Sequence, residues 1–352
     1  MLIEGVFAAV TTPFYPDERV YYRKLEANVA RYSRSLLAGL VVLGSTGEAP
    51  ALDDSETKEV FKVAAEAASA DKVLIAGVNR ESLRSVLELA EVAALQRYDA
   101  VLVRTPTYYS TQMTPQVVAN YFRAVADRSP LPVVLYNIPR CVPYQIPVEM
   151  VGELADHPNI IAIKDSSGSM ERIQGLVQAT RNARKRTVTV TPVFEAVTGR
   201  MVSPQARSEA PTFVAASDLA GGAALAVAPP VIPTKTRTKE VGFQVLTGSA
   251  SQILPSLEAG ASGAILGFGA CAPEACYEVY FAWKERDQKL AAEKQERIAK
   301  PNQRITGELG IAGIKYACDF NGYYGGYPRQ PLLALNADQR REIESLLSEI
   351  RN

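Results

Sequence analysis

The chain has 352 residues, of which 47% are hydrophobic, and its 38 Lys and Arg residues balance its 38 Asp and Glu residues. This balance argues against a nucleic-acid or anionic-membrane partner, and no run of 18 or more apolar residues predicts a membrane span. The N-terminus has no basic segment followed by an apolar run, so we expect no secretory signal.

Short apolar runs alternate with longer amphipathic segments from the N-terminus onward. The runs are rich in Val, Ile and Leu with little polar alternation, which is typical of strands buried on both faces of a parallel sheet. We predict strands at residues 6–11, 39–43, 73–78, 100–103, 132–136, 160–164, 243–247 and 263–266. We predict helices between them at residues 22–35, 54–68, 82–95, 115–126, 148–155 and 169–181, with cap signals at Asp53 and Thr114.

Eight strands that alternate with helices predict an α/β fold of the closed (β/α)8 TIM barrel type. A doubly wound sheet is the competing fold, but it normally carries a glycine-rich phosphate turn, and the sequence contains no GxGxxG. We predict that the barrel occupies residues 1–272 and that a C-terminal helical region occupies residues 273–352. Its helices are expected at residues 274–297, 303–318 and 337–350.

Residues 186–241 break this rhythm, because a connection between the sixth helix and the seventh strand is usually only a few residues long. The segment is rich in Val, Thr, Ala and Pro. A connection from a helix to a strand lies at the N-terminal face of a barrel, opposite the catalytic face. We therefore expect this insertion to affect assembly or stability rather than chemistry. Its composition fits short strands at 187–190 and 212–215, or partial disorder.

The rare residue types narrow the chemistry. The four cysteines form no CxxC pair, which fits a reduced, cytoplasmic protein better than a disulfide scaffold. The only histidine, His157, lies in a turn-like sequence and is expected to have a surface or capping role. This argues against a Ser-His-Asp triad, a His-rich zinc site and a His general base. We therefore look to Lys, Tyr, Ser, Thr, carboxylates and backbone for the chemistry.

In a barrel, catalytic groups lie where strands end and the following loops begin. Lys164 ends the sixth predicted strand and Tyr136 ends the fifth. Desolvation disfavours the charged form of a lysine, and a neutral amine is a nucleophile for a carbonyl. A phenol beside it would move the protons of the reaction. By position alone, a lysine that extends into solvent and a tyrosine packed at the rim are the favoured interpretations.

Small and hydroxyl-bearing residues follow the second strand. In the sequence of Ser45, Thr46 and Gly47, backbone N–H groups and hydroxyls are able to approach a carboxylate, and Glu48 is placed to orient the loop. An ordinary turn between a strand and a helix remains the alternative interpretation.

Two further strand ends carry candidate groups. Tyr108 and Tyr109 follow the fourth strand and would form a proton relay with Tyr136, or an aromatic contact between subunits, or both. Gly248 and Ser249 follow the seventh strand, where the backbone is able to contact a substrate carboxylate. Together the strand ends favour imine chemistry on a 2-oxo acid such as pyruvate.

Three motifs in this order resemble the dihydrodipicolinate synthase / N-acetylneuraminate lyase family. They are GSTGE at residues 44–48, YNIP at 136–139 and IKDSSG at 163–168, and the resemblance covers nearly the whole chain except about residues 186–241. Within the family the chain is most similar to 4-hydroxy-2-oxoglutarate aldolase, on residues 105–109, 129–136, 157–160 and 322–326. The resemblance implies a lyase for a small 2-oxo acid, with no metal or organic cofactor, that assembles as a homo-oligomer, a dimer or a tetramer.

The resemblance also implies a role for each candidate residue. Lys164 would form the Schiff base, Tyr136 would act as acid and base, and a tyrosine of the 108/109 pair would act as relay, supplied in the synthases by a neighbouring subunit. The residues implied to bind the substrate carboxylate or line the pocket are Ser45, Thr46, Gly47, Ser166, Gly248 and Ser249.

One loop departs from the family pattern. Synthases place an arginine two positions beyond the proline of the YNIP motif, but this chain has Cys141 there and Arg140 one position early. The arginine that grips the second substrate of the synthases is thus absent or displaced, and Arg140 is the remaining candidate. Our leading hypothesis is cleavage of 4-hydroxy-2-oxoglutarate, or a close relative, to pyruvate and an aldehyde such as glyoxylate. The alternatives are dihydrodipicolinate synthase and a barrel that binds 2-oxo acids without catalysis.

Overall fold

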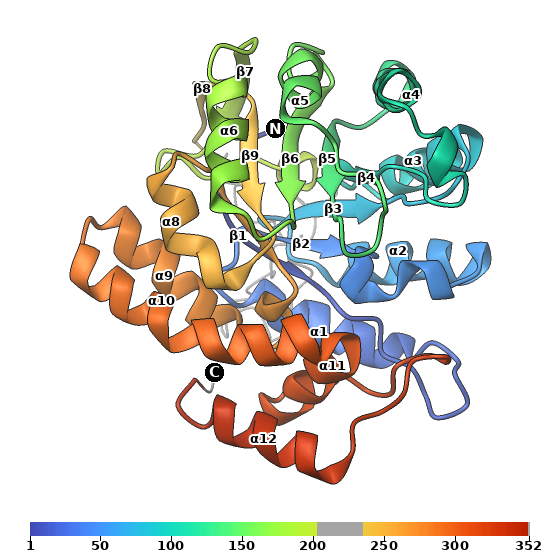
Figure 1. The fold of residues 1–352 in the computed structure, drawn as a ribbon, viewed down its shortest axis with the longest axis vertical. Helices are drawn as coiled ribbons and strands as arrows, with labels where there is room; N and C mark the ends of the chain where they lie inside the picture. Colours follow the sequence, from blue (N-terminus) through green and yellow to red (C-terminus); the bar gives the residue numbers. More distant parts are fainter. Residues whose placement is uncertain (203–234, 351–352) are drawn as a thin grey trace, which may run out of the picture.

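The computed structural model describes residues 1–202 and 235–350, which fold around a closed barrel of eight parallel strands (Figure 1). The order around the barrel is β1-β10-β9-β6-β5-β4-β3-β2. This confirms the predicted (β/α)8 barrel and excludes the doubly wound sheet. The strands are β1 (Gly5–Ala9), β2 (Gly39–Val42), β3 (Val73–Gly77), β4 (Ala100–Arg104), β5 (Val133–Asn137), β6 (Ile160–Asp165), β9 (Gln244–Thr247) and β10 (Gly263–Leu266).

The barrel strands are apolar over most of their length because each has one face toward the barrel interior and the other toward the helices. Every residue of these strands is buried except Arg104, which ends β4 and is partly exposed. Side chains such as Phe7, Leu102 and Ile265 form a separate cluster inside the barrel. The interior is therefore a packed core, and polar groups gather only at its two ends.

Helices surround the barrel on the outside (Figure 1). They are α1 (Tyr22–Ser33), α2 (Asp54–Ala67), α3 (Leu83–Leu95), α4 (Pro115–Arg128), α5 (Val148–Leu154), α6 (Met170–Thr180), α8 (Ile253–Glu258) and α9 (Pro273–Lys284). Both predicted caps are confirmed, since Asp53 forms a capping box with Glu56 and Thr114 accepts from the Val117 N–H. Our prediction missed α8, because six residues are too few to show a helical period.

The C-terminal helices differ from the prediction at two places. They are α10 (Gln288–Asn302), the π-helical turn η8 (Gln303–Glu308), α11 (Gly310–Phe320) and α12 (Ala337–Leu347). The single helix expected at 274–297 is wrong: the chain breaks at Arg286, which has φ 64°, and Asp287 then caps α10. The helix expected at 303–318 begins instead as a π turn, and Gly310, with φ 62°, starts α11. The division of the chain at residue 272 stays a prediction.

The insertion begins with a strand, as predicted for residues 187–190. β7 (Arg186–Val190) pairs antiparallel with β8 (Arg237–Val241), and α7 (Gly199–Val202) lies between them in the sequence. The strand expected at 212–215 lies outside the described residues. Val188 and Val190 pack on Leu2, which precedes β1, and the hairpin therefore lies at the N-terminal face of the barrel.

The single histidine and the four cysteines have structural positions. His157 bonds to Asp127 through Nε2 at 2.9 Å and accepts from the Asn159 N–H through Nδ1, which confirms its predicted turn role. All four cysteines are free thiols, as expected, and three are buried. Within the described residues, no helix is both long and apolar enough to cross a bilayer, and no His, Cys, Asp and Glu side chains cluster as metal ligands.

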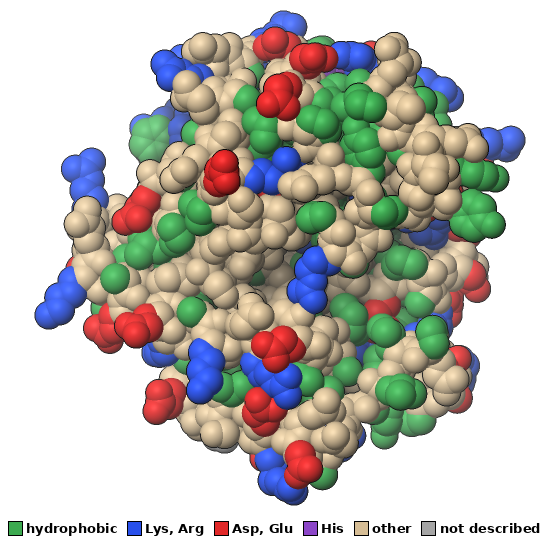
Figure 2. Space-filling view, viewed as in Figure 1, with side chains coloured by type: hydrophobic (Ala, Val, Ile, Leu, Met, Phe, Trp, Pro, Cys, Tyr) green, Lys and Arg blue, Asp and Glu red, His purple; other side chains and the backbone are tan. Residues whose placement is uncertain are grey.

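Figure 2 shows one face of the molecule. Lys and Arg side chains are interspersed with Asp and Glu over the C-terminal helices, while hydrophobic side chains gather between α4 and α5. No large patch of a single sign of charge appears on this face, in keeping with the balanced composition.

Candidate active site

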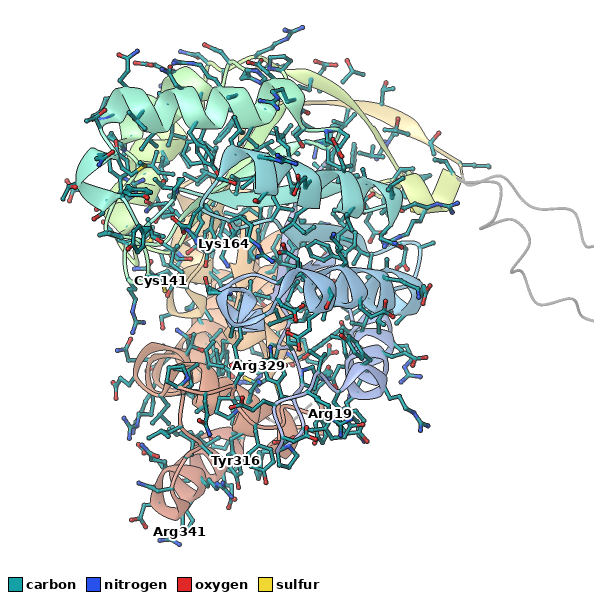
Figure 3. The ribbon with its side chains drawn as sticks, turned by 90° about the vertical axis from the view of Figure 1, so that its right-hand side faces the viewer. Arg19, Cys141, Lys164, Tyr316, Arg329 and Arg341 are labelled. Atoms are coloured by element: carbon teal, nitrogen blue, oxygen red, sulfur yellow. The ribbon has the colours of Figure 1, made fainter. Side chains whose placement is uncertain are left out.

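The two strongest candidates lie side by side at the C-terminal end of the barrel. Tyr136 on β5 is the register partner of Lys164 on β6, and the Lys164 Nζ lies 4.5 Å from the centre of the Tyr136 ring. Both are almost fully buried, and Figure 3 shows Lys164 inside the barrel. Among the described residues, no carboxylate lies within ion-pair distance of this Nζ. The amine therefore faces an aromatic ring rather than an anion, which leaves it available to a carbonyl.

A hydroxyl connects this pair to the turn after β2. The Tyr136 phenol lies 3.4 Å from the Ser45 Oγ. Ser45–Gly47 forms one 3-10 turn, and the Thr12 hydroxyl donates to the Gly47 carbonyl at 2.7 Å. The structure thus brings the predicted carboxylate-binding turn next to the tyrosine.

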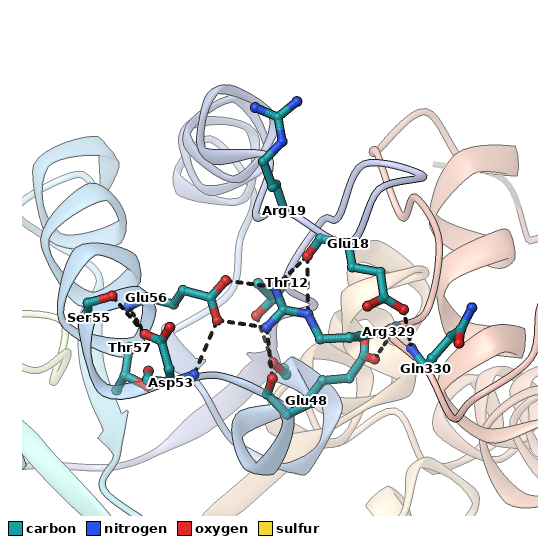
Figure 4. A network of polar contacts seen from close by, with 12 residues as sticks. Thr12, Glu18, Arg19, Glu48, Asp53, Ser55, Glu56, Thr57, Arg329 and Gln330 are labelled. Atoms are coloured by element: carbon teal, nitrogen blue, oxygen red, sulfur yellow. Dashed lines mark hydrogen bonds and ion pairs between the residues drawn. The ribbon is translucent and has the colours of Figure 1, made fainter.

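This turn is bounded by strained backbone. Leu43 and Glu48 both have positive φ, 57° and 55°, in the left-handed region that non-glycine residues rarely adopt. Backbone of this kind costs about 1–3 kcal/mol for each residue and persists only where other contacts hold it. Figure 4 shows such contacts around Glu48.

The end of β6 is fixed by a buried ion pair that our sequence reasoning did not select. Asp165 follows Lys164 directly and accepts from Arg172 Nε at 2.6 Å and from Asn137 Nδ2 at 2.8 Å. Its other oxygen accepts from the Ser167 N–H at 3.0 Å. Charge-assisted bonds of this kind hold the strand end, and with it the lysine. The sequence signal that could have revealed this ion pair was an acid directly after the lysine, followed by an arginine seven residues after that acid.

Ser166 and Gly248 are brought together on the same rim. The Gly248 N–H donates to the Asp165 carbonyl at 2.7 Å. A Cβ at Gly248 would lie 2.0 Å from the Ser166 Oγ, so only glycine fits beside this serine. Ser249 follows and donates its N–H to the Thr247 Oγ1 at 3.3 Å.

Tyr108 and Tyr109 lie apart from the barrel interior. Their side chains are 80% and 60% exposed, and the two rings meet edge to face at 5.1 Å between centres. Glu81 holds their loop by accepting from the Tyr108 N–H at 3.0 Å and from Arg104 at 2.8 Å. Burial acts to raise the pKa of Glu81, but these bonds and those from Thr107 outweigh it and lower the pKa to about 2.

The altered loop after β5 contacts the C-terminal helices. Arg140 donates to the carbonyl of Gly307, in the π-helical turn η8, at 2.5 Å. Cys141, where the synthases carry an arginine, is exposed, and Val142 packs inside the barrel. Arg140, the displaced arginine, is therefore bonded to the C-terminal helical region through the Gly307 carbonyl.

The comparisons with known proteins agree on one family. A model of the dihydrodipicolinate synthetase family matches residues 2–187 and 231–350, which leaves out most of the insertion. The chain is 26% identical to a 4-hydroxy-tetrahydrodipicolinate synthase of Natronomonas pharaonis, over 98% of this chain and 97% of the relative. It is 27% identical to an L-threo-3-deoxy-hexylosonate aldolase of Hypocrea jecorina, over 98% and 95%.

Solved structures show the same fold. A dihydrodipicolinate synthase from Bacillus anthracis superposes with a TM-score of 0.78 at 21% identity and covers 99% of each chain. A prophage protein of the dihydrodipicolinic acid synthase family from E. coli K12, solved in complex with pyruvate, also has a TM-score of 0.78, at 22% identity over 99% of each chain.

Proposed function

This chain belongs to the dihydrodipicolinate synthetase family, and we propose that it is a Schiff-base aldolase that cleaves a 4-hydroxy-2-oxo acid, such as 4-hydroxy-2-oxoglutarate, to pyruvate and an aldehyde. The family and its hexylosonate aldolase members are lyases, and so is this protein. The observation that carries the finer proposal is the buried Lys164, which faces Tyr136 and has no carboxylate partner among the described residues.

The chemistry follows from these two groups. The Lys164 amine attacks the C2 carbonyl of the substrate, and loss of water gives a protonated imine. The C4 hydroxyl loses its proton to a base as the C3–C4 bond breaks, and the bonding electrons move to the iminium as an enamine. The aldehyde leaves, the enamine takes a proton at C3, and water releases pyruvate and the free amine. Tyr136 is the group within reach to move these protons.

The neighbouring turns would hold the acid end of the substrate. The Ser45 hydroxyl lies beside Tyr136 in the Ser45–Gly47 turn, which also carries the Thr46 hydroxyl, and Ser166, Gly248 and Ser249 follow the strands β6 and β9 at the same end of the barrel. The pyruvate bound to the E. coli relative supports this choice of ligand. Fixed donors around a carboxylate orient the ketone toward the amine.

The two candidate substrates release different aldehydes. Cys141 stands where the synthases carry the arginine that grips their second substrate, and Arg140 is bonded to the Gly307 carbonyl, so this loop departs from the synthase pattern. A second candidate is a six-carbon 3-deoxy-2-oxo acid, supported by the L-threo-3-deoxy-hexylosonate aldolases among the relatives. Cleavage of such a substrate would release a three-carbon hydroxyaldehyde instead of glyoxylate, by the same steps.

The exposed tyrosines support assembly with further copies of the chain. Large exposed aromatic rings that form a contiguous pair are typical of protein contacts. We propose that Tyr108 or Tyr109 reaches the site of a neighbouring subunit in a homo-oligomer. Sedimentation of the wild type and of Tyr108→Ala/Tyr109→Ala tests this, and an unchanged oligomer with unchanged turnover argues against it.

Borohydride trapping tests the chemical class. Incubation with pyruvate and borohydride should add one reduced pyruvyl group to Lys164, located by peptide mass spectrometry. Lys164→Ala should show no adduct. An adduct on another lysine, or none on the folded wild type, overturns the proposed mechanism and favours a barrel that binds without catalysis.

A coupled assay tests the substrate. Pyruvate release is measured from 4-hydroxy-2-oxoglutarate and from a 3-deoxy-2-oxo-hexonate, alongside condensation of pyruvate with aspartate semialdehyde. Turnover of aspartate semialdehyde without cleavage of either hydroxy acid would overturn the aldolase proposal and favour a synthase. The Natronomonas relative is named as a synthase of this kind.

A further inference from the structure

The C-terminal helix α11 places a buried lysine against the turn after β2. The Nζ of Lys315 lies 2.5 Å from the Glu48 Oε1, and the two side chains are 1% and 2% exposed. Lys315 also donates to the Tyr327 carbonyl at 2.6 Å, and its Nζ lies 4.2 Å from the centre of the Phe14 ring. Burial lowers the pKa of Lys315, and Glu48 opposes that effect. Removing either partner would leave the other charge buried and unpaired.

The other oxygen of Glu48 is held from the same C-terminal region. The Arg329 N–H donates to the Glu48 Oε2 at 2.9 Å (Figure 4). The Arg329 side chain does not bond to Glu48 but to both oxygens of Glu56 on α2 at 2.7 Å, to the Ala51 carbonyl at 2.7 Å and to the Glu18 carbonyl. Figure 3 shows Arg329 between the barrel and the C-terminal helices. Among the described residues, the Arg329 backbone N–H and the Lys315 side chain are the groups that contact the Glu48 carboxylate.

The backbone of Glu48 indicates why this carboxylate is held so firmly. Glu48 has φ 55° and ψ 33°, a conformation that glycine adopts without strain. A glutamate occupies this position although its backbone is strained there, and strain of this kind clusters at functional sites. The Glu48 N–H donates to the Ser45 carbonyl at 3.1 Å, so the position of Glu48 fixes the turn directly.

We propose that Lys315 is a positioning residue for the substrate: through Glu48 it holds the Ser45–Gly47 turn in the conformation that binds the carboxylate of the 2-oxo acid. The identity of the ligand rests on the proposed function. The C-terminal helical region is then part of the substrate site, although Lys315 itself acts only through Glu48.

Two matched variants test this role. Lys315→Met breaks the contact with Glu48, whereas Arg329→Met cuts another attachment of the same region to the barrel and keeps the backbone bond to Glu48. For each we measure the pyruvate concentration that gives half-maximal trapping on Lys164. The same titration with acetone, a ketone without a carboxylate, is the ligand control.

The expected result is selective for the carboxylate. Lys315→Met should raise the half-saturating pyruvate concentration about tenfold or more, the loss expected when a charge-assisted contact is removed. Trapping of acetone and the final extent of the pyruvate adduct should stay as in the wild type. Arg329→Met should change the pyruvate value by about twofold at most.

A second variant keeps the test decisive if Lys315→Met does not fold. Glu48→Gln/Lys315→Met removes both charges and leaves neither stranded, and it should show the same loss of pyruvate binding. An unchanged pyruvate titration in whichever variant folds overturns the proposal. Equal losses for acetone and pyruvate, or an equal loss in Arg329→Met, overturn it as well, because they indicate a general structural effect.

The wild-type protein separates this inference from the proposed function. If the wild type forms no adduct on Lys164, the Schiff-base mechanism fails, and calorimetry with pyruvate replaces trapping. Weaker pyruvate binding to Lys315→Met than to the wild type would then still support the positioning role. Equal binding, or no binding to the wild type, overturns it.

Discussion

The two ends of the barrel each bury a lysine, and the two lysines have different partners. At the N-terminal end, the Nζ of Lys72 donates to the carbonyls of Ser35 and Leu37 at 2.8 and 3.0 Å. At the C-terminal end, the Nζ of Lys164 faces the ring of Tyr136. Burial alone therefore does not mark a reactive lysine. An amine whose acceptors are all supplied by the fold is structural, and one left facing a phenol is available for chemistry.

Carboxylates show the same contrast. Asp99, at the N-terminal end, accepts from the N–H groups of Leu74 and Gly199 at 2.9 and 3.1 Å. Burial raises the pKa of Asp99, against these bonds and the nearby Arg200. Glu48, at the C-terminal end, instead holds a strained turn. At the N-terminal end, Asp99 bonds to backbone groups that hold the fold together. At the C-terminal end, Glu48 holds the turn that lies beside the candidate site.

The largest expected effect on turnover distinguishes Lys164 from Lys72. Lys164→Ala should lower the turnover of the best substrate on the order of 10⁴-fold or more, because the proposed mechanism takes its nucleophile from this side chain. Lys72→Ala should leave turnover within about threefold and lower the free energy of unfolding by about 1–3 kcal/mol, since two buried carbonyls lose their donor. Steady-state kinetics and denaturant titration measure both. A comparable loss of turnover in the two variants would break the comparison.

The next effect separates two buried tyrosines. Tyr136→Phe should lower turnover by about 10²- to 10⁴-fold through the loss of proton transfer. Tyr98, which precedes β4 and donates to the Phe61 carbonyl at 3.0 Å, is the control. Tyr98→Phe should cost about 1 kcal/mol of stability and leave turnover unchanged. Full activity of Tyr136→Phe would remove the phenol from the mechanism.

A carboxylate at the N-terminal end should affect stability alone. Asp99→Ala leaves two N–H groups without an acceptor and should lower the free energy of unfolding by about 3 kcal/mol. Asp99→Asn, which keeps an acceptor oxygen, should lose less. Denaturant titration measures the difference, with turnover at saturating substrate as the check. A fall in turnover of the folded Asp99→Ala would show that the N-terminal end reaches the chemistry.

The smallest effect concerns the loop of the exposed tyrosines. The pKa of Glu81 is lowered to about 2 from an ordinary 4.5, so its stabilising contribution is present above about pH 4.5 and is lost as the pH falls toward 2. The side chain is 44% exposed, and solvent screening keeps the effect small. Between pH 6 and pH 3, the wild type should lose about 1–2 °C more of Tm than Glu81→Gln. Equal losses would show that Glu81 does not hold this loop.

The sequence predicted the features that repeat or that end a strand. The barrel followed from apolar runs at regular spacing, and Lys164 and Tyr136 were found because each ends such a run. Their assigned roles stay predictions. The pair of Glu48 and Lys315 was out of reach, because 267 residues separate the two and no local pattern marks a partner so distant.

Irregular backbone was the other limit. The break at Arg286 and the π turn before Gly310 depend on single residues with positive φ, whereas the helical period continues across both places. The ion pair of Asp165 and Arg172 showed a visible spacing, but the spacing gained meaning only once β6 and α6 were placed.

The hairpin of the insertion has a consequence for protein engineering. Val190 on β7 lies opposite Arg237 on β8, so the chain that joins them leaves and returns at neighbouring points of one ladder. The entropy needed to close a loop between fixed ends grows only with the logarithm of its length. A foreign domain spliced between these strands would hang from the end of the barrel away from Lys164, so this enzyme offers a ready attachment point for a reporter or a scaffold.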